Sequence, residues 1–212
     1  MVYLISAGKH HGEKEMKITV LLQLVFAFFP PLIATGAPPA YGIRSGIITY
    51  DQTITLGKST LVNRLVVSFD DYGMKECRET YRNDILEETF LNDGRKIYSI
   101  KRKTAYVMGS AKNRTELRYS WDQVPVQAKK DGSAHLLPDI TVAGKQCGSY
   151  EVRSRSARST YAGWAGILLF SEVASARTVT TLRAAHIEEN VPVPAEKFRV
   201  PAGFRLQAFN GQ

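Results

Sequence analysis

The C-terminal quarter of the chain constrains the fold most, because two strand-like segments are followed there by a stretch that proline keeps out of a regular strand. Residues 161–173 and 178–187 are rich in aromatic and β-branched side chains, which favour β-strands. Small residues between them suit a short turn. Pro192, Pro194 and Pro201 follow, and proline has no N–H to donate to a sheet. We therefore expect strand, turn, strand and then an irregular closing segment.

This closing segment, residues 190–204, is called the clasp below. Pro194 can open a single helical turn at residues 195–198, because the first position of a helix needs no N–H donor. A turn at that place would press Phe198 and Phe204 against a sheet. The clasp is thus expected to contribute to the core.

The N-terminal residues resemble a secretory leader. Lys17 precedes an apolar run, residues 18–29, which ends at Pro30-Pro31 and leads into small residues. This order is typical of a signal peptide, and the run is too short to span a membrane. We expect a signal peptide at residues 1–36, with 1–15 an upstream extension if Met16 is the true start. No cysteine follows the run, so the product would be periplasmic or secreted, without a lipid anchor there.

Length and composition are those of one globular domain, expected over residues 37–212. The chain has 212 residues, of which 44% are hydrophobic and 23% charged, and this can build a core. Its net charge of +8 is scattered along the sequence, as in a solvated basic surface, and it would also suit an anionic membrane surface. Arg153 and Arg155 would share one face of a strand, as an anion contact or as a solvated edge.

The middle of the chain predicts a meander of nine or ten antiparallel strands with few helices. Residues 85–91 and 96–100 form the clearest hairpin, because Asp93-Gly94 between them tolerates the positive φ of a tight turn. Gly144, Gly148 and Gly163 inside strand-like runs indicate bends that curl a sheet. The expected fold class is mainly β: a curved antiparallel sheet that forms a half-open barrel.

Residues 56–60, Leu-Gly-Lys-Ser-Thr, imitate a nucleotide-binding phosphate loop. The first glycine of that loop should stand at position 52, which is Gln52, and a helix should follow, whereas residues 60–69 alternate like a strand. We therefore expect a turn leading into a strand, with no nucleotide and no nucleic acid as partner.

Residues with catalytic potential are few and lack motif spacing. His135 and His186 have no partner at a characteristic distance in sequence, so we expect no enzyme activity, no metal and no cofactor. Cys77 and Cys147 could form a disulfide in an exported protein, or each could be a small buried side chain. The oligomeric state is not determined by the sequence.

Aromatic residues are the candidates for a binding site. In a fully packed sheet they would fill the core, whereas in a half-open barrel some would line a cavity for an apolar ligand. The candidate ligand-binding residues are Tyr50, Phe69, Tyr98, Tyr150, Trp164 and Phe170.

Four short segments resemble exported bacterial domains of the LolA-like family, the outer-membrane lipoprotein carriers, and most closely its poorly characterised periplasmic members. They are residues 69–76, 142–152, 166–169 and 190–204. The resemblance implies a curved antiparallel sheet whose hydrophobic concave side is covered by helices or loops and holds lipid or lipoprotein acyl chains. In this sequence only residues 115–127 offer a helical cover.

The leading hypothesis is therefore a periplasmic, non-enzymatic module that binds an apolar ligand, a lipid or a lipidated partner, in the concave sheet. A packed interaction or structural domain of the cell envelope is the alternative, and an uncharacterised hydrolase is the third.

Overall fold

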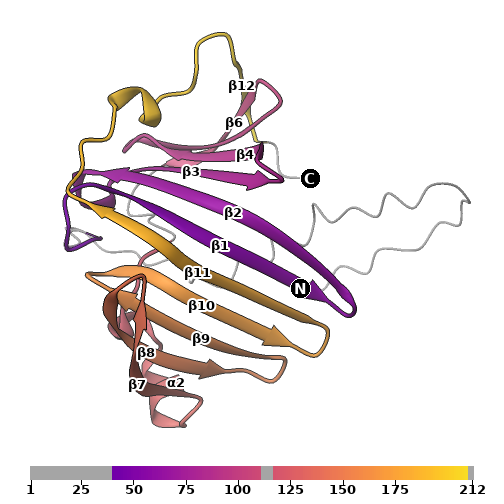
Figure 1. Ribbon diagram of the computed structural model, residues 1–212, viewed down its shortest axis with the longest axis vertical. Helices are drawn as coiled ribbons and strands as arrows, with labels where there is room; N and C mark the ends of the chain where they lie inside the picture. The colour runs from indigo at the N-terminus through magenta and orange to yellow at the C-terminus, as the bar shows by residue number, and fades with distance from the viewer. Residues whose placement is uncertain (1–39, 111–116, 210–212) are drawn as a thin grey trace, which may run out of the picture. The chain divides into compact units, whose positions relative to one another are not determined.

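The computed structural model describes residues 40–110 and 117–209, so the expected signal peptide lies outside the described residues. Twelve strands of this part form one sheet, with a few short helical turns beside it (Figure 1). The strands are β1 Gly46–Leu56, β2 Ser59–Asp70, β3 Lys75–Arg82, β4 Ile85–Asn92, β5 Lys96–Lys101, β6 Thr104–Ser110, β7 Ala134–Val142, β8 Lys145–Arg153, β9 Ala157–Trp164, β10 Ile167–Ser175, β11 Thr178–Glu189 and β12 Arg205–Ala208. The helical turns are η1 Asp71–Gly73, η2 Trp121–Gln123, α2 Val126–Lys130 and η3 Ala195–Phe198.

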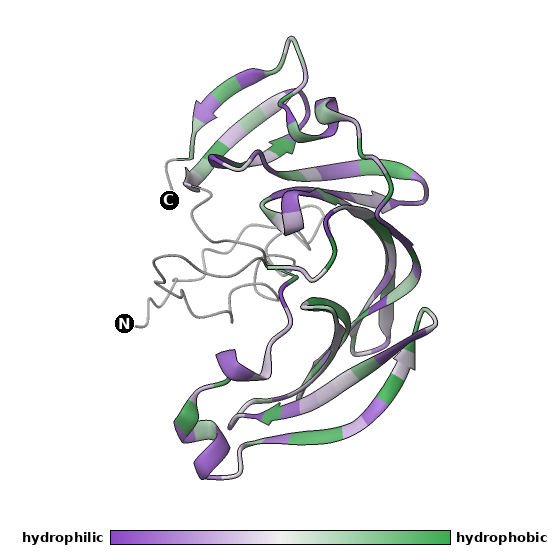
Figure 2. Ribbon diagram, turned by 90° about the vertical axis from the view of Figure 1, so that its left-hand side faces the viewer, coloured by the Kyte–Doolittle hydropathy of each residue, from purple (hydrophilic) through white to green (hydrophobic). Residues whose placement is uncertain are grey.

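Two antiparallel meanders make up the sheet. Strands β1 to β6 lie in chain order on one side, and β7 to β11 lie in chain order on the other. The meanders join where β1 pairs with β11, from Gly46 opposite Glu189 to Leu56 opposite Thr178. β12 adds to the outer edge of β6 as a parallel strand. The sheet is strongly curved, as Figure 2 shows, and the mainly β fold class expected from the sequence is confirmed.

The residues on the two faces follow from the strand registers. Tyr50 of β1 is paired with Leu65 of β2 and with Ala184 of β11, and all three side chains are buried on the same face. We call this the inner face. It contributes Tyr50, Leu65 and Ala184 to the largest hydrophobic core, which Tyr41 and Leu117 join from outside the strands.

The clasp covers the opposite, outer face. Pro194 precedes η3, and Phe198 at the end of η3 is only 4% exposed. Phe198 packs with Cys77 and Leu91, and Phe204 contacts the same cluster. The helical turn and the packing of both phenylalanines, expected from the sequence, are confirmed.

One expected strand is in fact a hairpin. Residues 161–173 read as a single strand, but Ala165 and Gly166 turn the chain between β9 and β10 with φ values of 50° and 75°. Glycine tolerates this left-handed backbone, whereas alanine does so at a cost, so Ala165-Gly166 does not look like a turn in the sequence. The described sheet accordingly has twelve strands rather than nine or ten.

Several local expectations hold. Gly57 and Lys58 form the turn that leads into β2, and β4 pairs with β5 across residues 93–95. Cys77 and Cys147 are both free and buried, so the disulfide, one of two alternatives, is absent from the described residues. Gly148 and Gly163 lie directly opposite each other in β8 and β9. Each lies at an irregularity with its other neighbouring strand, because β7 shifts register on β8 opposite Gly148 and β10 shifts register on β9 next to Gly163, as expected of glycines that bend a sheet. Gly144 lies in the turn between β7 and β8.

Candidate functional site

A segment outside the strands lies over the inner face of β8 and β9. This cover segment, residues 117–130, contains η2 and α2. The side chain of Ser120 caps η2 by accepting a hydrogen bond from the backbone N–H of Asp122, as serine commonly does. The helical cover expected at residues 115–127 is thus present from Trp121 onward as two short turns, while residues 115–116 lie outside the described part.

The start of the cover segment is attached to β10 by backbone hydrogen bonds. The N–H of Tyr119 donates to the carbonyl of Gly166 at 2.8 Å, and the N–H of Leu168 donates to the carbonyl of Leu117 at 2.7 Å. The register of β10 on β9 shifts between Leu168 and Phe170, and the pairing of β10 with β11 begins at Phe170. The cover segment therefore pairs with the end of β10 that lies outside this ladder.

Four aromatic rings meet where the cover segment packs on the sheet, and we call them the aromatic cluster. The ring of Tyr150 has its centroid 5.3 Å from that of Tyr119, 5.4 Å from Trp121 and 5.2 Å from Tyr161. Tyr150 and Tyr161 belong to the sheet, whereas Tyr119 and Trp121 belong to the cover segment. The Nζ atom of Lys129 lies 4.6 Å from the centre of the Trp121 ring, a distance suited to a cation–π contact.

Gly163, which lies opposite Gly148, makes room for the cover segment. A Cβ atom on Gly163 would come within 2.1 Å of Tyr119 Cγ and 2.6 Å of the Ile167 carbonyl oxygen. A Cβ atom on Gly148 would lie 3.4 Å from the Tyr119 hydroxyl. A side chain at residue 163 would hold the ring away from the sheet, whereas a Cβ atom at residue 148 would make only an ordinary contact, so it is Gly163 that lets Tyr119 lie against the backbone.

The tyrosines of the cluster suit contact rather than proton transfer. Burial raises the pKa of Tyr119 to about 12, and the carboxyl of Asp139 and the thiol of Cys147 act in the same direction. Burial also raises the pKa of Tyr150, with smaller contributions from Tyr161 and Tyr119. Both phenols are therefore neutral at physiological pH. They offer flat apolar rings, each with one hydroxyl.

Of the six residues expected at the site, only Tyr150 belongs to this cluster. Tyr50 and Phe69 lie on the same inner face but deep in its core, each 0% exposed. The Tyr50 hydroxyl donates to the Leu168 carbonyl at 2.8 Å. The Phe69 ring meets the Tyr41 ring edge-on, with centroids 4.9 Å apart.

The other three expected residues lie on the outer face. Phe170 is paired with Arg183, whose guanidinium carbon lies 5.7 Å from the ring centre, on the side opposite Leu182. Trp164 follows Gly163, whose Cβ side faces Tyr119, so alternation turns Trp164 outward, where Lys145 Nζ lies 4.5 Å from its ring. Tyr98 packs against the cluster of Phe198, Cys77 and Leu91, and its hydroxyl donates a hydrogen bond to Asp93 Oδ2 at 3.1 Å.

Three residues of the cluster, Tyr119, Trp121 and Tyr161, were not among the expected site residues. Tyr119 and Trp121 stand inside the segment that the sequence offered as a cover. An aromatic pair within an otherwise polar stretch is the signal that could have pointed to them.

The inner face also contains a buried polar group on β3. Arg78 Nε lies 3.1 Å from the carboxylate of Glu76, and both side chains are at most 6% exposed. The Tyr41 hydroxyl donates to the same carboxylate at 2.7 Å. Burial and then the Glu76 charge raise the pKa of Tyr41 well above its usual value. The apolar floor of the inner face therefore changes to a polar one at β3.

Within residues 40–110 and 117–209, histidine, cysteine and carboxylate side chains form no group of three suited to a metal ion. In the same ranges there is no helix with the length and hydropathy needed to cross a membrane.

No protein-family model matches the sequence, and no curated protein matches it either. Among solved structures, the chain is similar to the MucA/MucB complex of Pseudomonas aeruginosa, with 11% identity and a TM-score of 0.43, over 79% of this chain and 60% of that chain. The chain thus spans 60% of the length of that match.

Two further solved structures cover more of their own length. The LolA superfamily protein NE2245 from Nitrosomonas europaea shows 11% identity and a TM-score of 0.42, over 74% of this chain and 90% of that chain. The lipoprotein LppX of Mycobacterium tuberculosis shows 14% identity and a TM-score of 0.40, over 70% and 88%. A LolA superfamily protein is thus among the matches, as the resemblance in the sequence implied, and at these identities the similarity concerns the fold alone.

Proposed function

We propose that this protein is a non-enzymatic binding module that takes up the apolar part of a lipid or a lipidated protein between the cover segment and the inner face. The observation that carries the proposal is the aromatic cluster, which is divided between the rigid sheet and a segment outside it. An apolar chain could take the place of the Tyr119 and Trp121 rings and pack against Tyr150 and Tyr161 of the sheet. The sheet itself would not need to open.

The attachment of the cover segment supports this proposal. Its helical turns η2 and α2 have three and five residues, and isolated helices of this length are not stable in water. Their position therefore depends on packing, mainly of Val124, Tyr119 and Trp121 against Tyr150. A ligand that offers equal apolar contact could displace them at little cost.

Binding of a fluorescent fatty acid to the purified protein tests the proposal. We expect micromolar or tighter binding, competed by unlabelled fatty acid or phospholipid. Trp121→Glu should weaken it strongly, because the charge would enter the apolar contact region. Trp164→Glu is the matched control on the outer face and should bind nearly as well as the wild type.

The results separate the candidate sites. Loss of binding in Trp164→Glu alone would show that the ligand binds on the outer face, beside Trp164. If the wild-type protein binds neither fatty acid nor phospholipid, the proposal is wrong.

A packed interaction domain is the second candidate, and one observation favours it. Tyr50 and Phe69, at the centre of the inner face, are 0% exposed and already in contact with Leu168 and Tyr41. At that place the sheet is filled by its own side chains. A ligand would therefore occupy the β8–β9 end of the inner face, or no ligand at all.

The proposal includes export to the periplasm or the medium, where a lipid or lipoprotein partner would be met. It also treats residues 37–212 as the mature domain. N-terminal sequencing of the protein from its native host should start near Ala37. Recovery of a chain that starts at Met1 or Met16 would contradict export while leaving the binding experiment unaffected.

A further inference from the structure

Lysine and arginine dominate the hairpin turns at one end of the sheet. In an antiparallel meander alternate turns fall at the same end. The turns of β1–β2, β3–β4, β5–β6, β8–β9 and β10–β11 therefore share one end, which we call the hairpin end (Figure 1, where β1–β2 and β10–β11 turn at the right). Five basic residues and one acidic residue occupy these turns: Lys58, Arg102, Lys103, Arg155, Arg177 and Asp84.

The turns at the opposite end have the reverse balance. Between β2 and β3, β4 and β5, β7 and β8, and β9 and β10, the turn residues include one basic side chain, Arg95, and two acidic ones, Asp71 and Asp93. The positive charge of the turns is thus concentrated at the hairpin end. Such a distribution attracts an anionic surface in one orientation.

Exposed aliphatic side chains accompany the basic residues at the hairpin end. They lie within a few residues of the turns and are 38–69% exposed: Leu56, Val62, Ile85, Leu86 and Val179. Basic side chains beside exposed apolar ones are typical of segments that bind at the interface of a lipid bilayer.

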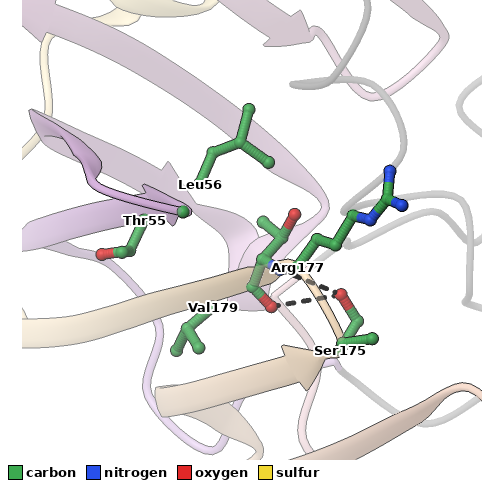
Figure 3. A pocket seen from close by; sticks show the side chains of 8 residues that line it. Thr55, Leu56, Ser175, Arg177 and Val179 are labelled. Carbon is green, nitrogen blue, oxygen red and sulfur yellow. Dashed lines mark hydrogen bonds between the residues drawn. The ribbon is translucent and has the colours of Figure 1, made fainter.

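The two central turns form one connected platform with a hollow in it (Figure 3). The N–H of Gly57 donates to the carbonyl of Arg177 at 3.3 Å, which links the β1–β2 turn to the β10–β11 turn. The hollow has a volume of about 520 Å³ and is open to solvent. Leu56 and Val179 are among the residues that line it, and Arg177 adds a cation.

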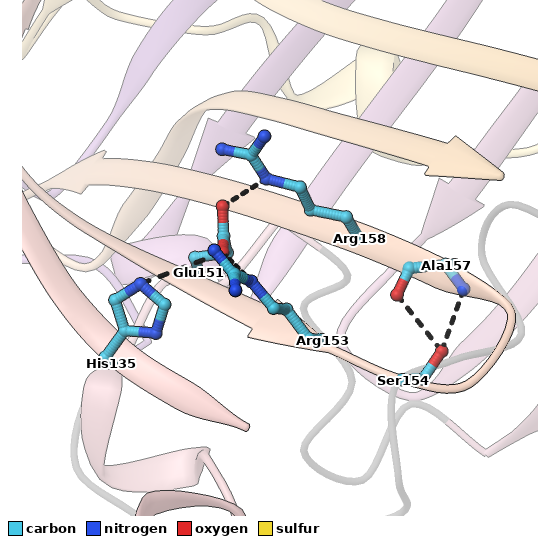
Figure 4. Close-up of polar contacts among 6 residues, drawn as sticks. All are labelled: His135, Glu151, Arg153, Ser154, Ala157 and Arg158. Carbon is cyan, nitrogen blue, oxygen red and sulfur yellow. Dashed lines mark hydrogen bonds and ion pairs between the residues drawn. The ribbon is translucent and has the colours of Figure 1, made fainter. Parts of the chain in front are cut away.

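The neighbouring hairpin of β8 and β9 adds two more cations in fixed positions (Figure 4). Arg153 and Arg158 face each other across the strands, an arrangement that like charges disfavour. The carboxylate of Glu151, 1% exposed, accepts a hydrogen bond from the Nε atom of each and so holds the pair together. The arginine side chains remain 62% and 61% exposed.

We propose that the hairpin end is a docking surface for an anionic phospholipid bilayer. Lys58, Arg177 and the arginines near the β8–β9 turn contact lipid phosphates, and Leu56 and Val179 enter the interface between headgroups and acyl chains. The partner is a bilayer because the cations and the aliphatic residues share the tips of the hairpins, so a flat surface can meet both at once. This surface differs from the aromatic cluster and does not depend on ligand binding there.

Co-sedimentation with vesicles tests the docking surface. The full-length protein is mixed with vesicles of phosphatidylcholine alone or with added phosphatidylglycerol. The double variant Lys58→Glu with Arg177→Glu is compared with Arg95→Glu with Lys96→Glu, which changes the net charge equally at the opposite end of the sheet. Residues 1–36 are the same in both variants, so a difference between the variants reports on the turns.

We expect the wild type to bind the phosphatidylglycerol vesicles and to be released by salt. The hairpin-end variant should lose about tenfold or more in partition coefficient, and the control variant much less. Circular dichroism would verify that both variants are folded. Equal losses in the two variants, no loss in the hairpin-end variant, or binding to duplex DNA but not to vesicles would each overturn the proposal.

Discussion

Gly163 lies directly beneath the ring of Tyr119, so close that a Cβ atom on residue 163 would stand 2.1 Å from Tyr119 Cγ. This contact joins the sheet to the cover segment. Replacing the glycine by alanine must push the ring outward or shift β9, because the Ile167 carbonyl blocks the other direction at 2.6 Å.

Gly163→Ala is therefore expected to lower the free energy of unfolding by about 1–3 kcal/mol, the usual cost of overpacking. Gly148→Ala, directly opposite in β8, should change it by less than about 1 kcal/mol, because only the Tyr119 hydroxyl is near. Urea unfolding of both variants measures the difference. Equal stability of the two variants would show that Tyr119 is not held against the sheet.

Phe198→Ala should destabilise the protein by about 3–5 kcal/mol, as expected for a buried aromatic residue replaced by alanine. Phe198 fills the outer-face cluster of Cys77 and Leu91 and is 4% exposed. Phe209→Ala, at a position 49% exposed, should stay within about 0.5 kcal/mol. If the denaturation midpoint of Phe198→Ala matches that of the wild type, the clasp does not contribute to the core.

Glu151 should make stability depend on acid pH. Burial raises the pKa of this carboxyl, but the hydrogen bonds from Arg153 and Arg158 outweigh it, so the folded-state pKa lies below the usual 4.5. A carboxyl of lowered pKa stabilises the fold above its unfolded-state pKa, and the contribution is lost as the pH falls through its folded-state pKa.

The stability difference between wild type and Glu151→Gln is thus expected to be largest near neutral pH and to shrink below about pH 4.5. Glu188→Gln, an exposed position on β11, is the control and should show little difference at any pH. Urea unfolding across the acid range provides the test. A constant difference down to pH values where carboxylates are protonated would contradict the assignment.

The two thiols should be unreactive in the folded protein. Burial, followed by the Glu79 charge, raises the pKa of Cys77 to about 12, and burial also raises the pKa of Cys147. Because the thiolate is the reactive form, a disulfide reagent at neutral pH should label neither residue until denaturant is added. Rapid labelling of either cysteine without denaturant would show that its surroundings open readily.

Lys58→Ala should leave the free energy of unfolding within about 0.5 kcal/mol of the wild type, because Lys58 is exposed in a hairpin turn. Equilibrium dialysis with GTP and magnesium is expected to show no binding by either protein. Micromolar affinity that disappears in the variant would restore the phosphate-loop interpretation of residues 56–60.

Local features of the fold were predictable from the sequence, whereas long-range ones were not. Asp93-Gly94 and Pro194 act within a few residues of themselves, so the β4–β5 hairpin and η3 could be expected. The outward positions of Trp164 and Phe170 depend on the register beside the shift in β10, which no periodicity reveals. The contact between Tyr119 and Gly163 joins segments distant in sequence, and for this reason the aromatic cluster was only partly anticipated.

The pairing of β1 with β11 also has a consequence for how the protein folds. Every other antiparallel pair joins consecutive strands, so each meander can form through contacts that are close in the chain. The β1–β11 pair must instead close a loop that contains most of the domain, and the entropy of that closure is lost before its contacts are gained. The rate of folding should therefore be set at this central seam, and substitutions there should slow folding more than substitutions at the outer strands.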